Sequence, residues 1–164
     1  MGKFTNVLMA GALAMLAFSS CSEEKKGYVI DGQVADVKEG MMYLKKYVDK
    51  TFVEVDSAVI VDGKFKFEGV ASEALAHGLT TRKESNRPMV FFLENNAMNI
   101  TMNESGKEMT ITGSEANDIY LRNAKITRAK GYSLDSLLTA HPASPVAAYF
   151  VVKDFAYKLD LEGM

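Results

Sequence analysis

The chain has 164 residues, with 19 basic and 21 acidic side chains, and 48% of it is hydrophobic. These proportions are those of an ordinary globular protein, and the length suits one domain with a modest core. A net charge of −2, without a long block of like charge, argues against a nucleic-acid-binding protein. The chain has one cysteine, which excludes an internal disulfide, a paired-cysteine redox motif and a cysteine-based zinc site.

The N-terminus carries an apolar segment after a single lysine, Lys3. Residues 7–18 read VLMAGALAMLAF. This run is shorter than the roughly 20 residues of a membrane-spanning helix and has the length of the apolar part of a secretory signal. Two small residues, Ser19 and Ser20, then precede Cys21. The arrangement resembles a bacterial lipoprotein signal, in which a peptidase cuts before the cysteine and its sulfur receives a diacylglyceryl group.

This resemblance predicts residues 1–20 as a signal peptide and Cys21 as a lipidation site. Acyl chains anchor stably because each buried CH₂ group contributes about 0.8 kcal/mol. We therefore expect a protein of the cell envelope, anchored to the outer membrane through acylated Cys21, with residues 21–27 as a tether. The tether sequence SEEKK has two interpretations, a surface-export signal or a plain solvated linker. Both the periplasmic and the surface-exposed face therefore stay open.

Short strand-like segments with turn signals between them follow the tether. Alternating apolar and polar residues predict strands at 28–34, 41–48, 52–61, 64–70, 74–82, 89–94, 97–102 and 108–113. Asp62-Gly63 is a strong two-residue hairpin signal, after which Phe65 and Phe67 are expected to point inward. The number and spacing of the segments predict a mainly β fold, an antiparallel β-sandwich or partly closed barrel of about eight strands.

One of these strands, 52–61, is long and rich in valine. Because successive side chains of a strand point to opposite faces, its valines are predicted to share one face. They are Val53, Val55, Val59 and Val61.

The pattern changes to a helical one after residue 113. Ser114 is a candidate N-cap for a helix over 115–129, and Ser133 is a candidate cap for residues 134–140. Ser144 followed by proline predicts the start of a last helix over 146–159. The spacing of this last helix predicts a buried face formed by Ala148, Val151, Val152, Phe155 and Leu159. The organisation expected is thus a β-rich domain over 28–113 and a short α-helical extension over 114–164.

Parts of this region resemble a known family. The stretches YVIDGQVADVKEGMMYLKKY, FVEVDSAVIVDGKFKFEG, RPMVFFLENNAMNITM and ITGSEANDIY look like a domain of unknown function. That domain precedes the thioredoxin-like domain in Bacteroidetes-type lipoprotein thiol–disulfide oxidoreductases. The resemblance covers about residues 28–120, and residues 141–162 resemble the helical connector that follows, in a shortened form. It implies the fold and an envelope location but no catalytic residue, because the redox chemistry belongs to a downstream paired-cysteine domain that is absent here.

Candidate reactive residues are few, and no catalytic, cofactor-binding or metal-binding residue is predicted. His77 and His141 lack carboxylate neighbours at ligand spacing, so packing is the expected role of both. The remaining polar groups are expected to be solvated. They are the loop cations Arg82, Lys83 and Arg87, the strand carboxylates Glu54, Asp56 and Glu68, and two serines in Asp-Ser-apolar triplets that match a bacterial O-glycosylation pattern, Ser57 and Ser136.

The function predicted is that of a non-enzymatic envelope lipoprotein whose β-rich domain is a binding or interaction module. Its expected partners are membrane lipid, through acylated Cys21, and another envelope protein, with no cofactor and no nucleic acid. The alternative is the N-terminal part of a membrane-anchored thiol–disulfide oxidoreductase without its thioredoxin-like domain. A third hypothesis is a hydrolase, which a deep polar pocket containing His77 or His141 would favour.

Overall fold

The computed structural model describes residues 27–105, 107–126 and 133–155. The predicted mainly β fold with short C-terminal helices is confirmed. The end of the first predicted helix (127–129) and of the last (156–159) lie outside the described residues. The strands are β1 (Tyr28–Val34), β2 (Glu39–Val48), β3 (Thr51–Val61), β4 (Lys64–Gly69), β5 (Leu75–Thr80), β6 (Met89–Leu93), β7 (Ala97–Met102) and β8 (Met109–Thr112). The helices are α1 (Glu115–Ile126), α2 (Asp135–Ala140), α3 (Pro145–Phe150) and a π-helical turn η1 (Val151–Phe155).

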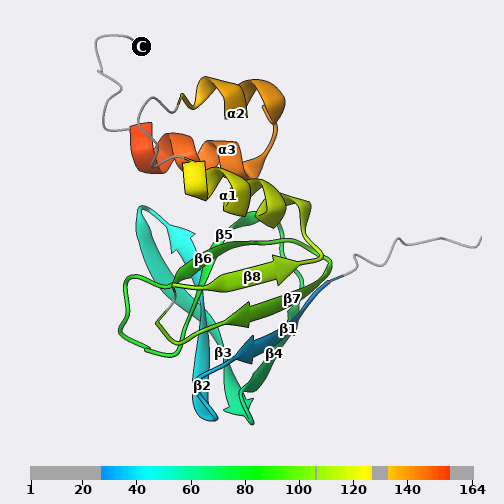
Figure 1. The fold of residues 1–164 in the computed structure, drawn as a ribbon, viewed down its shortest axis with the longest axis vertical. Helices are drawn as coiled ribbons and strands as arrows, with labels where there is room; N and C mark the ends of the chain where they lie inside the picture. The colour runs from blue at the N-terminus through cyan, green and yellow to red at the C-terminus, as the bar shows by residue number, and fades with distance from the viewer. Residues whose placement is uncertain (1–26, 106, 127–132, 156–164) are drawn as a thin grey trace, which may run out of the picture.

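The eight strands form one sheet in the order β6-β5-β2-β3-β4-β1-β7-β8, curled into a nearly closed barrel (Figure 1). The helices stack on one end, with α1 nearest the strands. The prediction of an antiparallel sheet needs one correction, because β1 runs parallel to β7. Local alternation cannot reveal this pairing, since the two strands are brought together by the folding of the five strands between them.

Strands β3 and β4 separate directly after the turn that joins them. Their turn is a tight two-residue hairpin in which Asp62 has φ 50° and Gly63 has φ 78°, which confirms the predicted hairpin signal. Beyond it, β3 and β4 pair only at Val61 and Lys64, whereas β3 pairs with β2 along its whole length. The edge of β3 that faces away from β2 is therefore without a strand partner over 51–60 in the described part of the chain. We call this stretch the open edge.

A β-bulge in the same strand overturns the prediction that its valines share a face. The register shifts between Leu44 and Lys45, so that β3 holds one extra residue there. Val53 lies opposite Lys46 and Val59 opposite Met41, positions that fall on opposite faces of β2. None of the four valines is in the core. The exposed fractions of Val53, Val55, Val59 and Val61 are 50%, 52%, 62% and 61%.

Two apolar clusters form the core. The larger fills the barrel, and it includes Phe65 and Phe67, which confirms that both point inward. Gly32 permits this packing, because a Cβ at that position would come within 2.1 Å of the Phe65 ring. The second cluster joins the helices to the outer face of the barrel and includes Phe92, Tyr149 and Phe150.

Helix α1 closes the gap between the two ends of the sheet, because it contacts both edge strands, β6 and β8. Its Asn117 is fully buried. The Asn117 carboxamide accepts from the Phe92 N–H (2.8 Å) and donates to the Phe92 C=O (2.7 Å), as a neighbouring strand would. Ser114 caps α1 as predicted by accepting from the Asn117 N–H, and it donates to Glu94 at the end of β6.

The last helix begins as predicted but buries a different face. Ser144 is its N-cap and accepts from the Val146 N–H at 3.2 Å. The buried residues are Val146, Ala147, Tyr149 and Phe150, whereas Ala148 and Val152 are exposed. The predicted face is therefore wrong at Ala148 and Val152, whereas Val151 is partly buried and packs against the second cluster, as predicted. The aromatic rings of Tyr149 and Phe150 set the rotation of the helix, because they pack on Phe92 and Tyr120.

Replacing Asn117 with alanine is expected to lower the free energy of unfolding by about 2–4 kcal/mol, because it leaves a buried donor and acceptor of β6 unpaired. Asn123→Ala is the matched control on the same helix, since the hydrogen bond described for Asn123 is one that it donates to the Ile119 carbonyl of its own helix. The control is expected to cost less than about 1 kcal/mol. Urea denaturation measures both, and equal losses would contradict the role given to Asn117.

Candidate functional site

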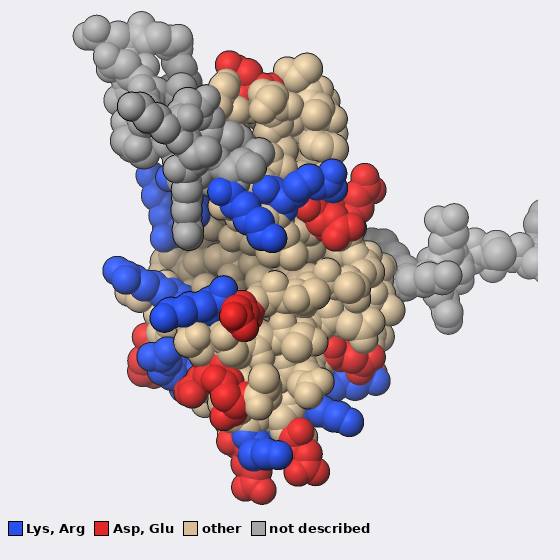
Figure 2. Space-filling view, in the orientation of Figure 1, with Lys and Arg blue, Asp and Glu red and all other residues tan. Residues whose placement is uncertain are grey.

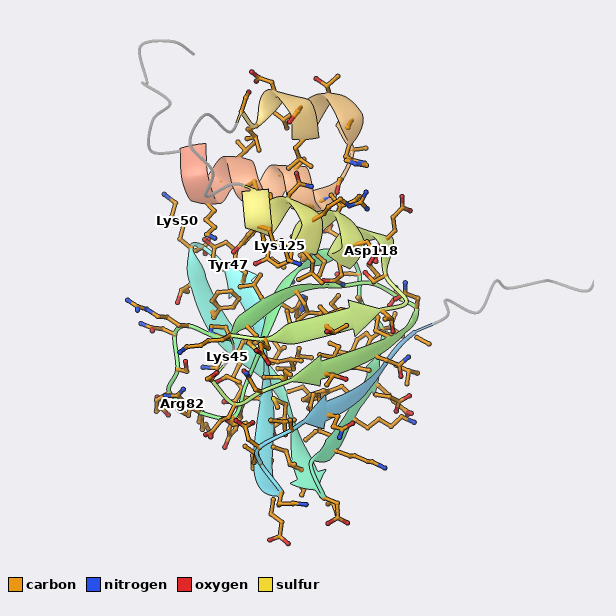
Figure 3. All side chains as sticks on the ribbon, viewed as in Figure 1. Lys45, Tyr47, Lys50, Arg82, Asp118 and Lys125 are labelled. Carbon is orange, nitrogen blue, oxygen red and sulfur yellow. The ribbon has the colours of Figure 1, made fainter. Side chains whose placement is uncertain are left out.

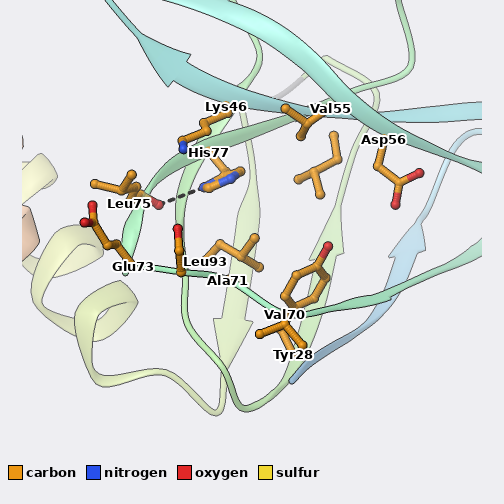
Figure 4. A pocket seen from close by; sticks show the side chains of 12 residues that line it. Tyr28, Lys46, Val55, Asp56, Val70, Ala71, Glu73, Leu75, His77 and Leu93 are labelled. Atoms are coloured by element: carbon orange, nitrogen blue, oxygen red, sulfur yellow. Dashed lines mark hydrogen bonds between the residues drawn. The ribbon is translucent and has the colours of Figure 1, made fainter. Parts of the chain in front are cut away.

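A hollow of about 230 Å³ lies beside Val55 and Asp56, in the middle of β3 (Figure 4). Its walls come from five strands and from the connection between β4 and β5, so it is built from segments distant in the sequence. The polar and charged residues around it are Tyr28, Lys46, Asp56, Ser72, Glu73 and His77. We call it the His77 hollow.

His77 is the most buried of these polar residues, with 6% of its surface exposed. Its Nδ1 lies 2.9 Å from the Leu75 carbonyl oxygen, drawn as the dashed line in Figure 4. A carbonyl only accepts, so Nδ1 carries the proton and Nε2 presents a lone pair. Burial lowers the pKa of His77, the nearby Lys46 charge lowers it further, and the bond to Leu75 partly opposes them. The ring is therefore neutral at neutral pH, with an acceptor nitrogen at the hollow.

The charged groups of the hollow are not paired with one another. In the described part of the chain, the ion pairs are Lys66–Glu68 and Lys83–Glu54, neither of which involves Lys46, Asp56 or Glu73. Asp56 accepts instead from the Ser57 N–H at 2.7 Å. Asp56 pairs with the buried Leu44 in the sheet but is itself exposed, so its carboxylate lies at the open side of the hollow. Partial burial, and to a lesser extent the Asp56 charge, raise the pKa of Tyr28.

The open edge of β3 runs beside this hollow, since Val55 and Asp56 belong to both. Val61 pairs with β4, so residues an even number away, including Val59 and Ser57, point their backbone groups to the same side. The bond from the Ser57 N–H to the Asp56 side chain agrees with this orientation. The site thus combines a row of backbone groups that no described strand pairs with, exposed valines and a polar hollow.

The His77 hollow does not assemble a hydrolase triad. Ser72, His77 and two carboxylates do line it, as the hydrolase hypothesis requires. A working triad needs the serine hydroxyl bonded to one imidazole nitrogen and a carboxylate on the other. Here the Leu75 carbonyl occupies Nδ1, and no hydrogen bond joins Ser72 to His77 among the described contacts. The hollow therefore has the residue types of that chemistry without its geometry.

The other residues singled out in the sequence lie apart from this hollow. His141 is partly buried and lines a separate depression with Glu94 and Glu115. Within the described ranges, no group of three or more His, Cys, Asp or Glu side chains is placed to hold a metal ion. Ser57 and Ser136 are both exposed. Cys21 lies outside the described residues, so its lipidation stays a prediction.

The predicted cationic loop is tied to the barrel instead of forming a basic site. Lys45 is 5% exposed, and its ammonium donates to the carbonyls of Lys83 (2.5 Å) and Ser85 (2.6 Å). Figure 3 shows Lys45 inside and Arg82 on the outer side of this region. Basic and acidic side chains are interspersed on the same face (Figure 2). The view shows no extended field of one sign on this face.

A second, more apolar hollow of about 400 Å³ lies between α3 and the β2–β3 turn. The turn residues Asp49 and Lys50 both have positive φ, 49° and 63°, and stand at its rim. Tyr47 packs edge-on against Tyr149 beside it. This hollow marks the junction of helices and barrel.

The comparisons with known proteins identify the family. The fold defines the class of domain: a mainly β barrel in which one strand edge is unpaired and helices cover one end. The family model named "Domain of unknown function (DUF4369)" matches residues 28–120, more than half of the chain. The chain therefore belongs to this family, and the predicted resemblance to a domain of unknown function is confirmed. No curated protein and no solved structure matches the chain significantly. In the described segments, no helix has the length and hydropathy to span a bilayer.

Sequence reasoning missed Tyr28, Lys46 and Glu73 as parts of one site, because they come from separate segments. The sequence does contain a signal for the open edge. The polar residues Glu54, Asp56 and Ser57 interrupt the apolar pattern of β3, although the strand order places β3 in the middle of the sheet. All three are exposed, and charged side chains are typical of edge strands.

The depressed pKa of His77 predicts a stability that depends on pH. In the unfolded chain the imidazole titrates near its ordinary value of about 6.5, whereas the folded protein resists protonation to a lower pH. The unfolded state therefore binds more protons below about pH 6.5, and the free energy of unfolding is expected to fall as the pH is lowered through that window.

Urea denaturation at several pH values, comparing the unsubstituted protein with His77→Asn, measures this contribution. The variant is expected to lose the part of the pH dependence that begins near pH 6.5. The same slope in both proteins would contradict a neutral, buried His77.

Proposed function

We propose that this protein is a lipid-anchored envelope protein whose β-rich domain binds an extended segment of another envelope protein along the open edge of β3. The observation that carries the proposal is the edge itself, over 51–60, with its backbone groups unpaired by any described strand. Strand addition to such an edge provides backbone hydrogen bonds for affinity and side-chain pockets for specificity.

Exposed apolar side chains also support the binding of a partner segment at the open edge. Val53, Val55 and Val59 each leave half or more of their surface in solvent. Long exposed edges invite non-specific pairing, and proteins usually guard them with bulges and charged side chains. β3 carries the bulge near Val55 and two exposed carboxylates, Glu54 and Asp56, yet keeps its valines exposed. This combination favours selective binding of a matching segment over general aggregation.

A second candidate function is the one implied by the parent proteins that the sequence resembles, the N-terminal part of a thiol–disulfide oxidoreductase. The observation that favours it is the resemblance of residues 141–162 to the connector before the redox domain. Sequencing the DNA that follows the coding region tests it. A thioredoxin-like reading frame with paired cysteines would support this candidate, and unrelated sequence would remove it.

The anchor is tested by growing cells with an acyl-chain probe. The unsubstituted protein is expected to incorporate the label and to fractionate with the outer membrane, because acylation of Cys21 provides the attachment. Cys21→Ala is expected to do neither, and Ser20→Ala is the control that leaves the acceptor thiol in place. An unlabelled, freely soluble protein without the substitution would contradict the localisation.

Binding at the open edge is tested with short random peptides displayed on phage and selected on the full chain in detergent. Selected peptides are expected to slow hydrogen exchange at the Val59 amide, which faces the open edge. Val59→Pro removes that donor without breaking a bond to β2, so it is expected to weaken peptide binding at least about tenfold.

Val59→Ala is the matched control, because it shortens the side chain and keeps the amide. It is expected to retain most of the affinity, and both variants are checked for an unchanged circular dichroism spectrum. Failure to select any peptide, or equal binding to Val59→Pro, would refute strand addition at β3.

A further inference from the structure

We propose that the His77 hollow receives the side chain of a lysine or arginine carried by the strand bound along β3. This inference rests on the proposed function, because it names the side chain that the bound segment presents. It is argued from three features of the hollow, namely its volume, its carboxylates outside any ion pair, and the acceptor nitrogen of His77.

The volume selects a side chain over a larger ligand. The hollow measures about 230 Å³, below the roughly 300–1,000 Å³ of sites for cofactors and drug-sized molecules. Val55 and Asp56 belong to both the hollow and the open edge, so the hollow lies beside the line that an added strand would follow. Alternate residues of such a strand point to the same side, which brings one long side chain to the hollow.

The charges favour a cation. The lining holds two carboxylates, Asp56 and Glu73, against one ammonium, that of Lys46. Neither carboxylate belongs to an ion pair in the part of the chain that the structure describes. Lys46 has a long flexible stem, which allows its charge to move into solvent when another cation enters. A guest carboxylate, by contrast, would face the negative charges of Asp56 and Glu73.

His77 adds the second, independent observation. The residue is 6% exposed, and its Nε2 has no hydrogen-bond partner among the residues that the structure describes. Since Nδ1 donates to the Leu75 carbonyl, Nε2 is an acceptor, and it can take a hydrogen bond from a donor that enters the hollow. Figure 4 shows the ring turned with Nδ1 toward Leu75 and its other side toward the hollow. Guanidinium and ammonium groups carry only donors, so they match both the acceptor nitrogen and the carboxylates.

The experiment titrates the full chain in detergent with propylguanidinium and, separately, with butyrate and propanol, while NMR follows the His77 ring and the Tyr28 ring. Propylguanidinium is expected to shift both sets of signals with a dissociation constant on the order of 1 mM. Butyrate and propanol are expected to leave them in place. A stronger response to butyrate or propanol, or no response to propylguanidinium, would overturn the proposal.

Substitutions locate the binding site. Asp56→Asn and Glu73→Gln are each expected to weaken propylguanidinium binding at least about threefold, through loss of a charge-assisted contact. Glu68→Gln is the matched control, because Glu68 lies outside the hollow in an exposed pair with Lys66. It is expected to change nothing. Equal binding by all three variants would overturn the assignment of the cation to this hollow.

The cation site and the proposed strand addition can be tested separately. The small probe does not need the open edge, so Val59→Pro is expected to bind propylguanidinium normally while losing the selected peptides. Peptide binding without propylguanidinium binding would refute only the cation site. Propylguanidinium binding without peptide binding would refute strand addition, and with it the partner side chain, while leaving a cation-binding hollow.

Discussion

The structure depends on the parting of β3 and β4 after a single pair, Val61 with Lys64. The tight Asp62-Gly63 turn brings the two strands together, and no ladder continues between them. Three consequences follow from this one constraint. The backbone of 51–60 is left unpaired on one side, its valines are left outside the core, and a hollow opens beside Asp56 and His77.

The opposite side of the barrel is closed by a side chain in place of a strand. Asn117 bonds both backbone groups of Phe92, and the fully buried amide leaves little room for another residue. One sheet edge is therefore closed by helix α1 while the edge of β3 remains open. This asymmetry is the reason to assign binding to β3, because an edge closed from within the chain cannot accept a partner in the same way. Family membership adds no activity, since the family is defined without one.

Much of the fold could be predicted from local sequence, and the site could not. Period-two alternation, the Asp62-Gly63 turn and the Ser114 and Ser144 caps are local signals, so they located the strands and helix starts. The parallel pairing of β1 with β7, the bulge near Val55 and the rotation of α3 are set by distant contacts. The His77 hollow combines residues from Tyr28 to Leu93, and only the folded chain brings them together. The lipidation of Cys21 is predicted from a sequence pattern alone.

The most direct measurement of the central claim is residue-resolved hydrogen exchange in the protein without any partner. In an antiparallel pair, alternate amides bond to the neighbouring strand. The account predicts fast exchange at Val59, whose amide faces the open edge, and slow exchange at Ala58 and Ile60, whose amides face β2. Comparable protection at all three positions would show that the edge of β3 is already occupied, and would contradict the account.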